Sequence, residues 1–207
     1  MKEPGRTPAG CRALLFDFDG TLTRPNALDF ASLRKALGCR ADANILDYID
    51  GLHVEEKRRT ELATLDAFET AAARASYPNA GAEDLTRLLR ARGIPFGILS
   101  RNTRECIRIA LENFPLLREH HFAFILTRQN SGRPKPNPDG VLRAAELFGL
   151  PPHEVLVVGD FVYDIAAGSA AGAPTVLVTN GHPLPPFDPA PDHTVTGLSE
   201  IEALLDP

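Results

Sequence analysis

The sequence predicts an α/β protein: a doubly wound parallel sheet with helices on both faces, together with a small all-helical insert. Three observations predict this class. Short apolar runs alternate with longer segments of helical period, this order repeats along the chain, and one stretch in the first half of the chain has only helical pattern. Repeated strand–helix–strand order is typical of parallel sheets that are covered by helices.

The predicted strands are short apolar runs of the kind found in sheets buried on both faces. They are Ala13–Phe18, Ile94–Ser100, Ala123–Thr127, Val155–Gly159 and Pro174–Val178. The predicted helices between them are Glu83–Arg92, Arg104–Asn113, Pro138–Phe148 and Tyr163–Ala171. In the first of these helices the leucines fall on one face, and Gly93 then ends the helix.

The stretch from about residue 24 to about residue 78 contains no strand-like run. Its pattern predicts helices over Leu28–Leu37, Ala43–Ile49 and Val54–Ala75, separated by glycines and followed by a turn at Pro78–Gly81. We therefore expect two units: an α/β core formed by residues 1–23 and 79–207, and a helical insert formed by residues 24–78.

Charge and composition exclude several classes of function. The 207 residues carry a formal net charge of −5 at pH 7, so a broad surface for a nucleic-acid polymer is not expected. No apolar run approaches the ~20 residues of a membrane span, and the first residues do not resemble a signal peptide. The three cysteines are widely spaced, which favours a reducing cytoplasm over a disulfide framework or a zinc site. The sequence does not indicate an oligomeric state.

Two carboxylates follow the first predicted strand. Asp17 and Asp19 stand two residues apart, immediately before Gly20 and Thr21. Open α/β sheets bind ligands at the carboxyl ends of their strands, and alternation along a strand would place both carboxylates on one face. Close like charges resist joint ionisation unless a cation or a proton relieves them, which suits a metal site or a nucleophile paired with an acid. The alternative is a solvated loop, because Asp and Gly also favour turns.

A second acidic pair follows the strand Val155–Gly159. Asp160 alone would suit a helix cap, and Asp164 alone would suit the first turn of a helix. Together with the pair after the first strand, however, they would place four acids at one edge of the sheet. A hard divalent cation would neutralise them, and Mg²⁺ is usually held by carboxylates and water. The sequence therefore favours a Mg²⁺ site at this edge.

Two further segments stand near predicted strand ends. Three prolines in Arg133–Pro138 restrict the backbone around Lys135, which favours a rigidly presented lysine, although a turn before the next helix would use the same residues. Ser100 ends the second predicted strand and is followed by Arg101 and Asn102. Ser100 would equally suit the start of a turn or a helix cap. Each of these signals is weak when it is taken alone.

Taken together, the four motifs resemble one family over nearly the whole chain. In order, Asp-x-Asp-Gly-Thr, a serine after an apolar strand, a lysine before the fourth strand and Gly-Asp-x-x-x-Asp are similar to the haloacid dehalogenase superfamily. The insert after the first motif resembles the helical cap of its phosphoglycolate-phosphatase-like subfamily. The resemblance implies a Mg²⁺-dependent phosphatase that hydrolyses a small phosphomonoester, such as phosphoglycolate, through an aspartyl-phosphate intermediate.

The resemblance also implies catalytic roles for the matching residues. Asp17 matches the nucleophile that attacks phosphorus, and Asp19 matches the general acid that protonates the leaving alcohol and then helps to activate water. Ser100 matches the residue that hydrogen-bonds the transferring phosphoryl group. Lys135 matches the cation that steadies the nucleophile and the phosphate oxygens.

The metal site and the substrate contacts are implied in the same way. The matching Mg²⁺ ligands are Asp17, the main-chain carbonyl of Asp19 and Asp160. Asp164 matches a carboxylate of the metal site that acts through water or lies just behind the direct ligands. Arg101 stands where the family more often has threonine, so that Arg101 or Asn102 would contact the substrate. The expected partner is a small phosphorylated metabolite.

Two alternative functions stay open. A phosphomutase of the β-phosphoglucomutase type would keep the same core and differ in its cap. A non-catalytic binding or regulatory module would use the same scaffold, although such a module usually has a broken motif and every core position is filled here. Carbon–halogen cleavage is not expected, because the dehalogenases of the superfamily lack the acid at the position of Asp19 and need no Mg²⁺.

Overall fold

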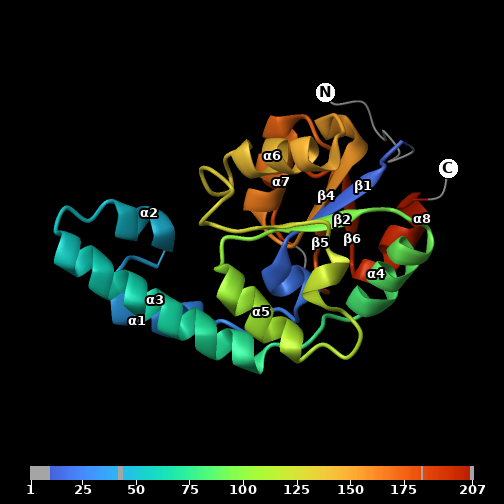
Figure 1. Ribbon diagram of the computed structural model, residues 1–207. Helices are drawn as coiled ribbons and strands as arrows, with labels where there is room; N and C mark the ends of the chain where they lie inside the picture. Colours follow the sequence, from blue (N-terminus) through green and yellow to red (C-terminus); the bar gives the residue numbers. More distant parts are fainter. Residues whose placement is uncertain (1–9, 42–43, 183, 206–207) are drawn as a thin grey trace.

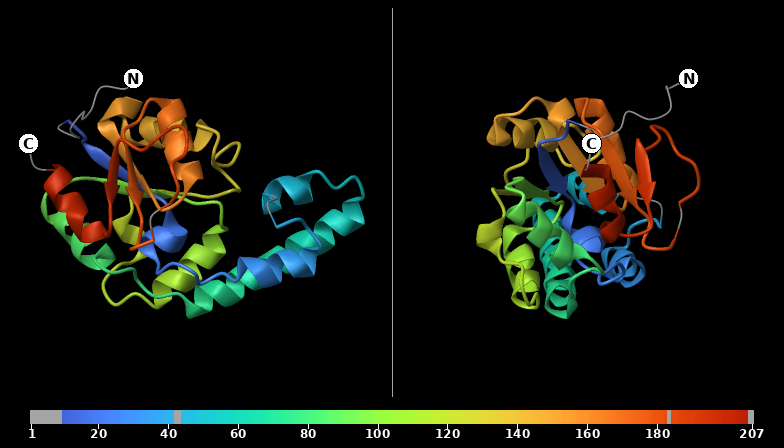
Figure 2. Two further views of the ribbon diagram at one scale, coloured as in Figure 1. Left: turned by 180° about the vertical axis from the view of Figure 1, so that it is seen from behind. Right: turned by 90° about the vertical axis from the view of Figure 1, so that its right-hand side faces the viewer.

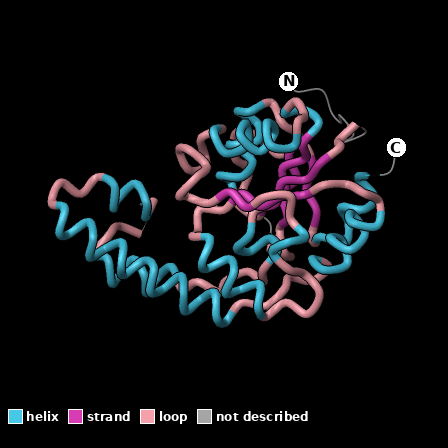
Figure 3. Tube along the Cα trace, viewed as in Figure 1, coloured by secondary structure: helices cyan, strands magenta, loops and turns pink. Residues whose placement is uncertain are grey.

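A computed structural model describes residues 10–41, 44–182 and 184–205 of the chain. Its strands are β1 (Ala13–Phe16), β2 (Phe96–Leu99), β3 (Ile125–Leu126), β4 (Val155–Gly159), β5 (Thr175–Val178) and β6 (His193–Val195). Its α-helices are α1 (Phe30–Leu37), α2 (Ile45–Asp50), α3 (Glu55–Ala75), α4 (Ala82–Ala91), α5 (Arg104–Glu112), α6 (Asp139–Phe148), α7 (Val162–Ala171) and α8 (Glu202–Leu205). Short helical turns are η1 (Phe18–Leu22), η2 (Glu119–His121), η3 (Pro152–Glu154) and η4 (Leu198–Ile201). Figures 1 and 3 show their arrangement.

The strands form one parallel sheet in the order β3-β2-β1-β4-β5-β6. Leu14 of β1 lies opposite Phe96 of β2 and Leu156 of β4, so β1 is hydrogen-bonded on both sides. The predicted doubly wound parallel sheet is confirmed. The edge strand β6 was not predicted, because only one of its three residues is buried and no apolar run marks it.

Helices cover both faces of the sheet, as predicted (Figure 2). The side chains of β1 contribute alternately to the two layers. Leu14 and Phe16 belong to the core cluster that contains buried residues of α4 and α5, whereas Ala13 and Leu15 belong to the cluster that contains buried residues of α6 and α7. All four are fully buried. Burial of a large apolar side chain stabilises a fold by about 1.5–3 kcal/mol. The apolar residues of β1 therefore favour a position between two layers of helices.

The insert consists of α1, α2 and α3, which extend away from the sheet in Figure 1. Asp29 caps α1 by accepting from the Ser32 N–H at 3.0 Å, and Asn44 caps α2 by accepting from the Leu46 N–H at 3.1 Å. Ala43, where the sequence predicts the second helix to begin, lies outside the described residues. The insert has its own apolar cluster, which comprises Leu33, Leu37, Ile45, Ile49 and Leu65. Within the described ranges, no helix combines the length and apolar character that a membrane span requires.

The two ends of the insert lie side by side on the core. Thr23 forms an antiparallel bridge with Pro78, and the N–H of Arg24 donates to the carbonyl of Tyr77 at 2.9 Å. The chain therefore leaves the core and returns to it at one place, as expected of an inserted segment. The division into two units remains a prediction.

Candidate active site

The predicted site residues meet at the carboxyl ends of β1, β2 and β4. Asp17 directly follows β1, Asp160 directly follows β4, and the N–H of Asp17 donates to the carbonyl of Val158 at 2.8 Å. From β1 the sheet extends through β2 to β3, and from β4 it extends through β5 to β6. The acidic residues therefore stand at the point where the strand order reverses, which is where doubly wound sheets bind their ligands.

The turn η1 brings the two acidic segments together. Gly20 has a φ of 84°, in the left-handed region that favours glycine. A Cβ atom at Gly20 would lie 2.2 Å from Oδ2 of Asp160, so a side chain at this position would collide with the second acidic segment. The hydroxyl of Thr21 donates to Oδ1 of Asp160 at 3.3 Å. The loops after β1 and β4 therefore approach each other so closely that position 20 has no room for a side chain, and Thr21 bonds to the second loop.

Three carboxylates form a cluster that would hold a metal ion. Asp17, Asp160 and Asp164 each offer an oxygen, and these oxygens lie within 4.8 Å of one another. The N–H of Phe161 donates to Oδ2 of Asp164 at 3.1 Å and orients its carboxylate. A donor set of oxygens alone fits a hard divalent cation such as Mg²⁺. The side chain of Asp19 is not part of this cluster, and its expected contribution is its main-chain carbonyl.

Lys135 reaches into the same cluster and partly neutralises it. Its Nζ donates to Asp17 Oδ1 and to Asp164 Oδ1, each at 2.5 Å, and to the carbonyl of Leu99 at 2.9 Å. Its side chain is only 5% exposed. Burial alone would lower the pKa of Lys135, but the carboxylates of Asp164 and Asp17 outweigh burial and raise it. The ammonium group therefore stays charged beside the first carboxylate.

Burial has the opposite consequence for the acids of the cluster. It raises the pKa of Asp17 well above its ordinary value, against the effect of Lys135, and the neighbouring carboxylates of Asp164 and Asp160 raise it further. Burial and Asp164 raise the pKa of Asp160 to about 7. A divalent cation among these oxygens would favour their ionised forms. The excess of negative charge and the donor set therefore both fit the Mg²⁺ ion expected from the sequence.

Asp19 lies apart from the metal-ligand cluster and contacts the residues that follow β2. Ser100 donates from its hydroxyl to Asp19 Oδ2 at 3.5 Å, and Asn102 donates from Nδ2 to the same oxygen at 3.2 Å. The N–H of Asn102 donates in turn to the Ser100 hydroxyl at 3.0 Å. Burial raises the pKa of Asp19, although the hydrogen bonds from Asn102 and Ser100 oppose it. A carboxyl group with a raised pKa suits a proton donor.

Arg101 lies between Ser100 and Asn102 in the sequence, but its side chain points to other partners. Its Nη2 donates to Oδ1 of Asn44, and its guanidinium carbon lies 5.2 Å from the ring centroid of Tyr163. The predicted substrate contacts of Ser100, Arg101 and Asn102 stay predictions.

Two asparagines that the sequence did not single out hold the turn after β1. Asn180 donates from Nδ2 to the carbonyl of Gly20 at 2.8 Å, and Asn79 donates from Nδ2 to the carbonyl of Thr21 at 2.9 Å. The same Nδ2 of Asn79 donates to Oδ1 of Asn180 at 2.8 Å. Asn180 comes just after β5, so the rule that polar residues at strand ends form the site would have found it.

A buried ion pair joins the insert to the core near the site. Arg128, which follows β3, donates from Nη1 to both carboxylate oxygens of Glu69 on α3, at 2.8 and 2.7 Å. The same Nη1 donates to the carbonyl of Arg101 at 3.2 Å, and Nη2 donates to Asp66 at 2.5 Å. Glu69 and Arg128 are 9% and 13% exposed. α3 is thereby tied to the loop that carries Ser100.

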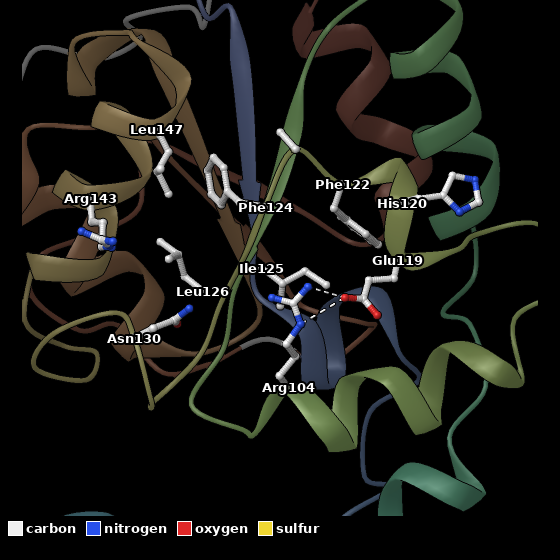
Figure 4. A pocket seen from close by; sticks show the side chains of 11 residues that line it. Arg104, Glu119, His120, Phe122, Phe124, Ile125, Leu126, Asn130, Arg143 and Leu147 are labelled. Carbon is white, nitrogen blue, oxygen red and sulfur yellow. Dashed lines mark hydrogen bonds and ion pairs between the residues drawn. The ribbon is translucent and has the colours of Figure 1, made fainter.

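A groove of about 640 Å³ lies beside the edge strand β3, away from these residues. Figure 4 shows that Phe122, Phe124 and Leu147 line it and that Arg104 and Glu119 are paired at one side. None of the predicted site residues lines this groove. The acidic cluster is therefore the site that the sequence and the fold indicate together.

Comparison with known proteins shows one family across most of the chain. A family model described as haloacid dehalogenase-like hydrolase matches residues 11–172. An uncharacterized hydrolase of Saccharomyces cerevisiae is 33% identical over 199 residues, which cover 94% of this chain and 90% of the yeast protein.

Two further similarities concern part of the chain or the fold alone. The phosphoglycolate phosphatase of Escherichia coli K12 is 32% identical over 99 residues, which cover 48% of this chain and 38% of that enzyme. The crystal structure of a haloacid dehalogenase-like protein from Bacteroides fragilis has a TM-score of 0.76 and 22% identity, covering 92% of this chain and 99% of the other. The structural similarity supports the fold.

Proposed function

Because the chain belongs to the haloacid dehalogenase-like hydrolases, we propose that it is a Mg²⁺-dependent phosphatase that hydrolyses a small phosphomonoester through an aspartyl phosphate on Asp17. One observation carries this proposal: Asp17, Asp160 and Asp164 meet at the switch point of the sheet, and Lys135 bonds to two of them. A carboxylate beside a buried cation and a cluster of oxygen ligands suits phosphoryl transfer, which mainly needs positioning and charge neutralisation.

In the first step, a carboxylate oxygen of Asp17 attacks phosphorus and forms the acyl phosphate. The bond between phosphorus and the ester oxygen breaks, and Asp19 gives its proton to the leaving alcohol. A carboxylate and a phosphate dianion repel each other, so this step requires positive charge. Lys135, 2.5 Å from Asp17 Oδ1, supplies part of that charge.

In the second step, water attacks the phosphorus of the acyl phosphate and releases inorganic phosphate. The now ionised Asp19 takes a proton from that water, and the carboxylate of Asp17 is restored. One acid–base group thus serves both steps, as is usual when a hydrolysis is divided into two displacements. Ser100 and Asn102, both bonded to Asp19 Oδ2, hold its carboxyl group in place.

The carboxylates of Asp17, Asp160 and Asp164 would hold the Mg²⁺ ion, together with the main-chain carbonyl of Asp19. When bound, Mg²⁺ supplies positive charge that stabilises the oxygens of the transferring phosphoryl group. The same carboxylates would repel a phosphate dianion without a cation, so phosphate release should depend on the metal.

The proposed substrate is small because the insert, residues 24–78, would act as a cap over the core formed by residues 1–23 and 79–207. The ion pair between Glu69 and Arg128 supports such an arrangement, since it ties α3 to the loop after β2. Phosphoglycolate is a candidate because a phosphoglycolate phosphatase is among the similar proteins. The three cysteines are free thiols, which supports a cytoplasmic location.

The test is phosphate release from a panel of small phosphomonoesters, with Mg²⁺ or with EDTA, by the wild type and by Asp17→Asn. We expect release that requires both Mg²⁺ and Asp17, because an amide cannot form the acyl phosphate. Asp84→Asn on the exposed face of α4 makes the same change of side chain and serves as the matched control.

Two results would contradict the proposal. Appreciable turnover by Asp17→Asn would mean that another group is the nucleophile. Conversion of a sugar phosphate to its isomer without phosphate release would indicate a mutase instead.

A further inference from the structure

Arg128 is a largely buried arginine that the proposed reaction steps do not use. It lies two positions after β3, and its side chain is 13% exposed. Its Nη1 donates to both carboxylate oxygens of Glu69 at 2.8 and 2.7 Å, and its Nη2 donates to Asp66 at 2.5 Å. Charge-assisted bonds to two carboxylates of the same helix, α3, hold the guanidinium in one orientation.

The part of α3 that supplies these carboxylates is packed on the core. Thr70 stands next to Glu69, and its hydroxyl oxygen lies 3.8 Å from Sγ of Cys106 on α5. Where α3 ends, the carbonyl of Ser76 accepts from Nδ2 of Asn113 at 3.0 Å, and Asn113 directly follows α5. Glu69 is therefore a fixed partner for Arg128.

Arg128 is also bonded to the loop after β2. Its Nη1 donates to the carbonyl of Arg101 at 3.2 Å, and its main-chain N–H donates to the carbonyl of Asn102 at 3.4 Å. The side chain therefore holds the carbonyl of the peptide unit that joins Arg101 to Asn102. Because a peptide unit is planar, the direction of this carbonyl also sets the direction of the Asn102 N–H.

The same peptide unit leads to the carboxyl group of Asp19. The N–H of Asn102 donates to the hydroxyl of Ser100 at 3.0 Å, and this hydroxyl donates to Asp19 Oδ2 at 3.5 Å. Nδ2 of Asn102 donates to the same oxygen at 3.2 Å. One peptide unit thus separates the guanidinium of Arg128 from the two groups that hold Asp19.

Arg128 has no comparable link to the metal-ligand cluster. Over the ranges that the structure describes, its side chain bonds only to α3 and to the loop after β2, whereas Lys135 bonds directly to Asp17. Loss of the Arg128 side chain should therefore disturb Asp19 and leave Asp17 and Lys135 in place.

We propose that Arg128 is a positioning residue for proton transfer: held by Glu69, it fixes the loop after β2 so that Asp19 faces the leaving group. Its effect falls on the protonation of the leaving alcohol and not on metal binding or on the attack by Asp17. This inference rests on the proposed phosphatase function and adds to it a residue that touches none of the reacting atoms.

The experiment compares esters whose leaving groups differ in their need for a proton. 2-Phosphoglycolate and glycerol 3-phosphate release an alcohol, which must be protonated as the bond to phosphorus breaks. p-Nitrophenyl phosphate releases a stable phenolate and needs no proton donor. The parameter is kcat/KM, because it reports phosphoryl transfer to Asp17 and excludes the later hydrolysis, in which Asp19 acts again.

Arg128→Met is expected to lower kcat/KM about 10- to 100-fold for the better of the two alkyl esters, since general acid catalysis contributes about 10²–10⁴-fold and only its geometry is disturbed. For p-nitrophenyl phosphate the loss should stay below about threefold. Arg128→Lys keeps the charge and should restore part of the activity on the alkyl ester. The Kd of Mg²⁺ measured by calorimetry should not change.

Two further variants serve as controls. Arg108→Met removes an exposed arginine of α5 that is also paired with two carboxylates, and it should leave both kinetic parameters unchanged. The double variant Glu69→Met/Arg128→Met leaves neither charge of the pair without its partner, so it provides a folded protein if Arg128→Met unfolds. It should show the same difference between the esters, because the carbonyl of Arg101 still lacks its donor.

Several outcomes would overturn the inference. An equal loss on the alkyl and aryl esters would mean that Arg128 only joins the insert to the core, and a raised Kd of Mg²⁺ would place its effect at the metal site. An unchanged kcat/KM for the alkyl ester, or a wild type that hydrolyses only the aryl ester, would also overturn it. Absence of Mg²⁺- and Asp17-dependent release from every ester by the wild type would instead contradict the proposed function.

Discussion

Replacement of Lys135 by methionine tests the charge balance of the site without any assumption about the substrate. The side chain is 5% exposed and bonds to Asp17 and Asp164, each at 2.5 Å. Methionine has a similar length but no charge. In Lys135→Met, the carboxylates of Asp17, Asp160 and Asp164 are left together in a buried place with no positive group among them.

The expected loss of stability follows from this burial. Removing one partner of a buried ion pair costs about 3–5 kcal/mol, because the remaining charge is uncompensated. We expect a value near the lower limit, about 3 kcal/mol, because burial and Asp164 already raise the pKa of Asp160 to about 7 and protonation will relieve part of the repulsion. For a chain of about 200 residues this corresponds to a fall in Tm of about 6–12 °C.

The assay is urea and thermal unfolding followed by circular dichroism, in EDTA and in excess Mg²⁺, at neutral pH. Lys57→Met makes the same change on the exposed surface of α3 and is the control. Mg²⁺ should return much of the lost stability to Lys135→Met, since a ligand at 100 times its Kd contributes about 2.7 kcal/mol. A loss below about 1 kcal/mol in EDTA, or no effect of Mg²⁺ on the variant, would refute the charge argument.

Three further outcomes are expected. Burial raises the pKa of Glu69 from 4.5 to about 7 in spite of Arg128, so its contribution to stability is present below pH 4.5 and is lost as the pH rises to about 7. The free energy of unfolding should therefore fall by up to about 3 kcal/mol over this pH range because of Glu69. Urea unfolding of Glu69→Gln should lack this fall, and the same fall in the variant would contradict the raised pKa of Glu69. Asp160→Ala should raise the Kd of Mg²⁺ at least about tenfold in calorimetry, and an unchanged titration would remove Asp160 from the ligand set. Asn180→Ala should lower the free energy of unfolding by about 1–3 kcal/mol, because the carbonyl of Gly20 loses a donor, and a melting curve identical to that of the wild type would contradict this.

The sheet and the acidic site could be predicted from the sequence because both depend on local pattern. A short apolar run such as Val155–Gly159 predicts a strand that is buried on both faces of the sheet. A polar residue that directly follows it, such as Asp160, then lies at the carboxyl edge of the sheet, where ligands bind. The same reasoning brought Asp17 to that edge, and the structure places the two carboxylates within 4.8 Å. Their roles in catalysis remain predictions.

The contacts that the sequence did not indicate join residues far apart in the chain. Glu69 and Arg128 are separated by 59 positions, and Glu69 lies in a charged helix whose sequence gives no sign that one carboxylate is buried. Asn79 and Asn180 are separated by 101 positions, and their pairing depends on how the turn after β1 meets the end of β5. Such contacts follow from the packing of the insert and the strands, which no local pattern contains.

Arg101 was only partly predictable from the sequence. Its place after β2 was visible in the sequence, and its contact with the substrate was an expectation of the family resemblance. Only the fold shows that its side chain contacts Asn44 and Tyr163.

The most direct test of the central claim is mass spectrometry of the protein stopped with acid during turnover of a phosphomonoester in the presence of Mg²⁺. The account predicts one added phosphoryl group on the peptide that contains Asp17, removable by hydroxylamine and absent from Asp17→Asn, which should release no phosphate. A phosphoryl group on another residue, or continued phosphate release by Asp17→Asn, would contradict it.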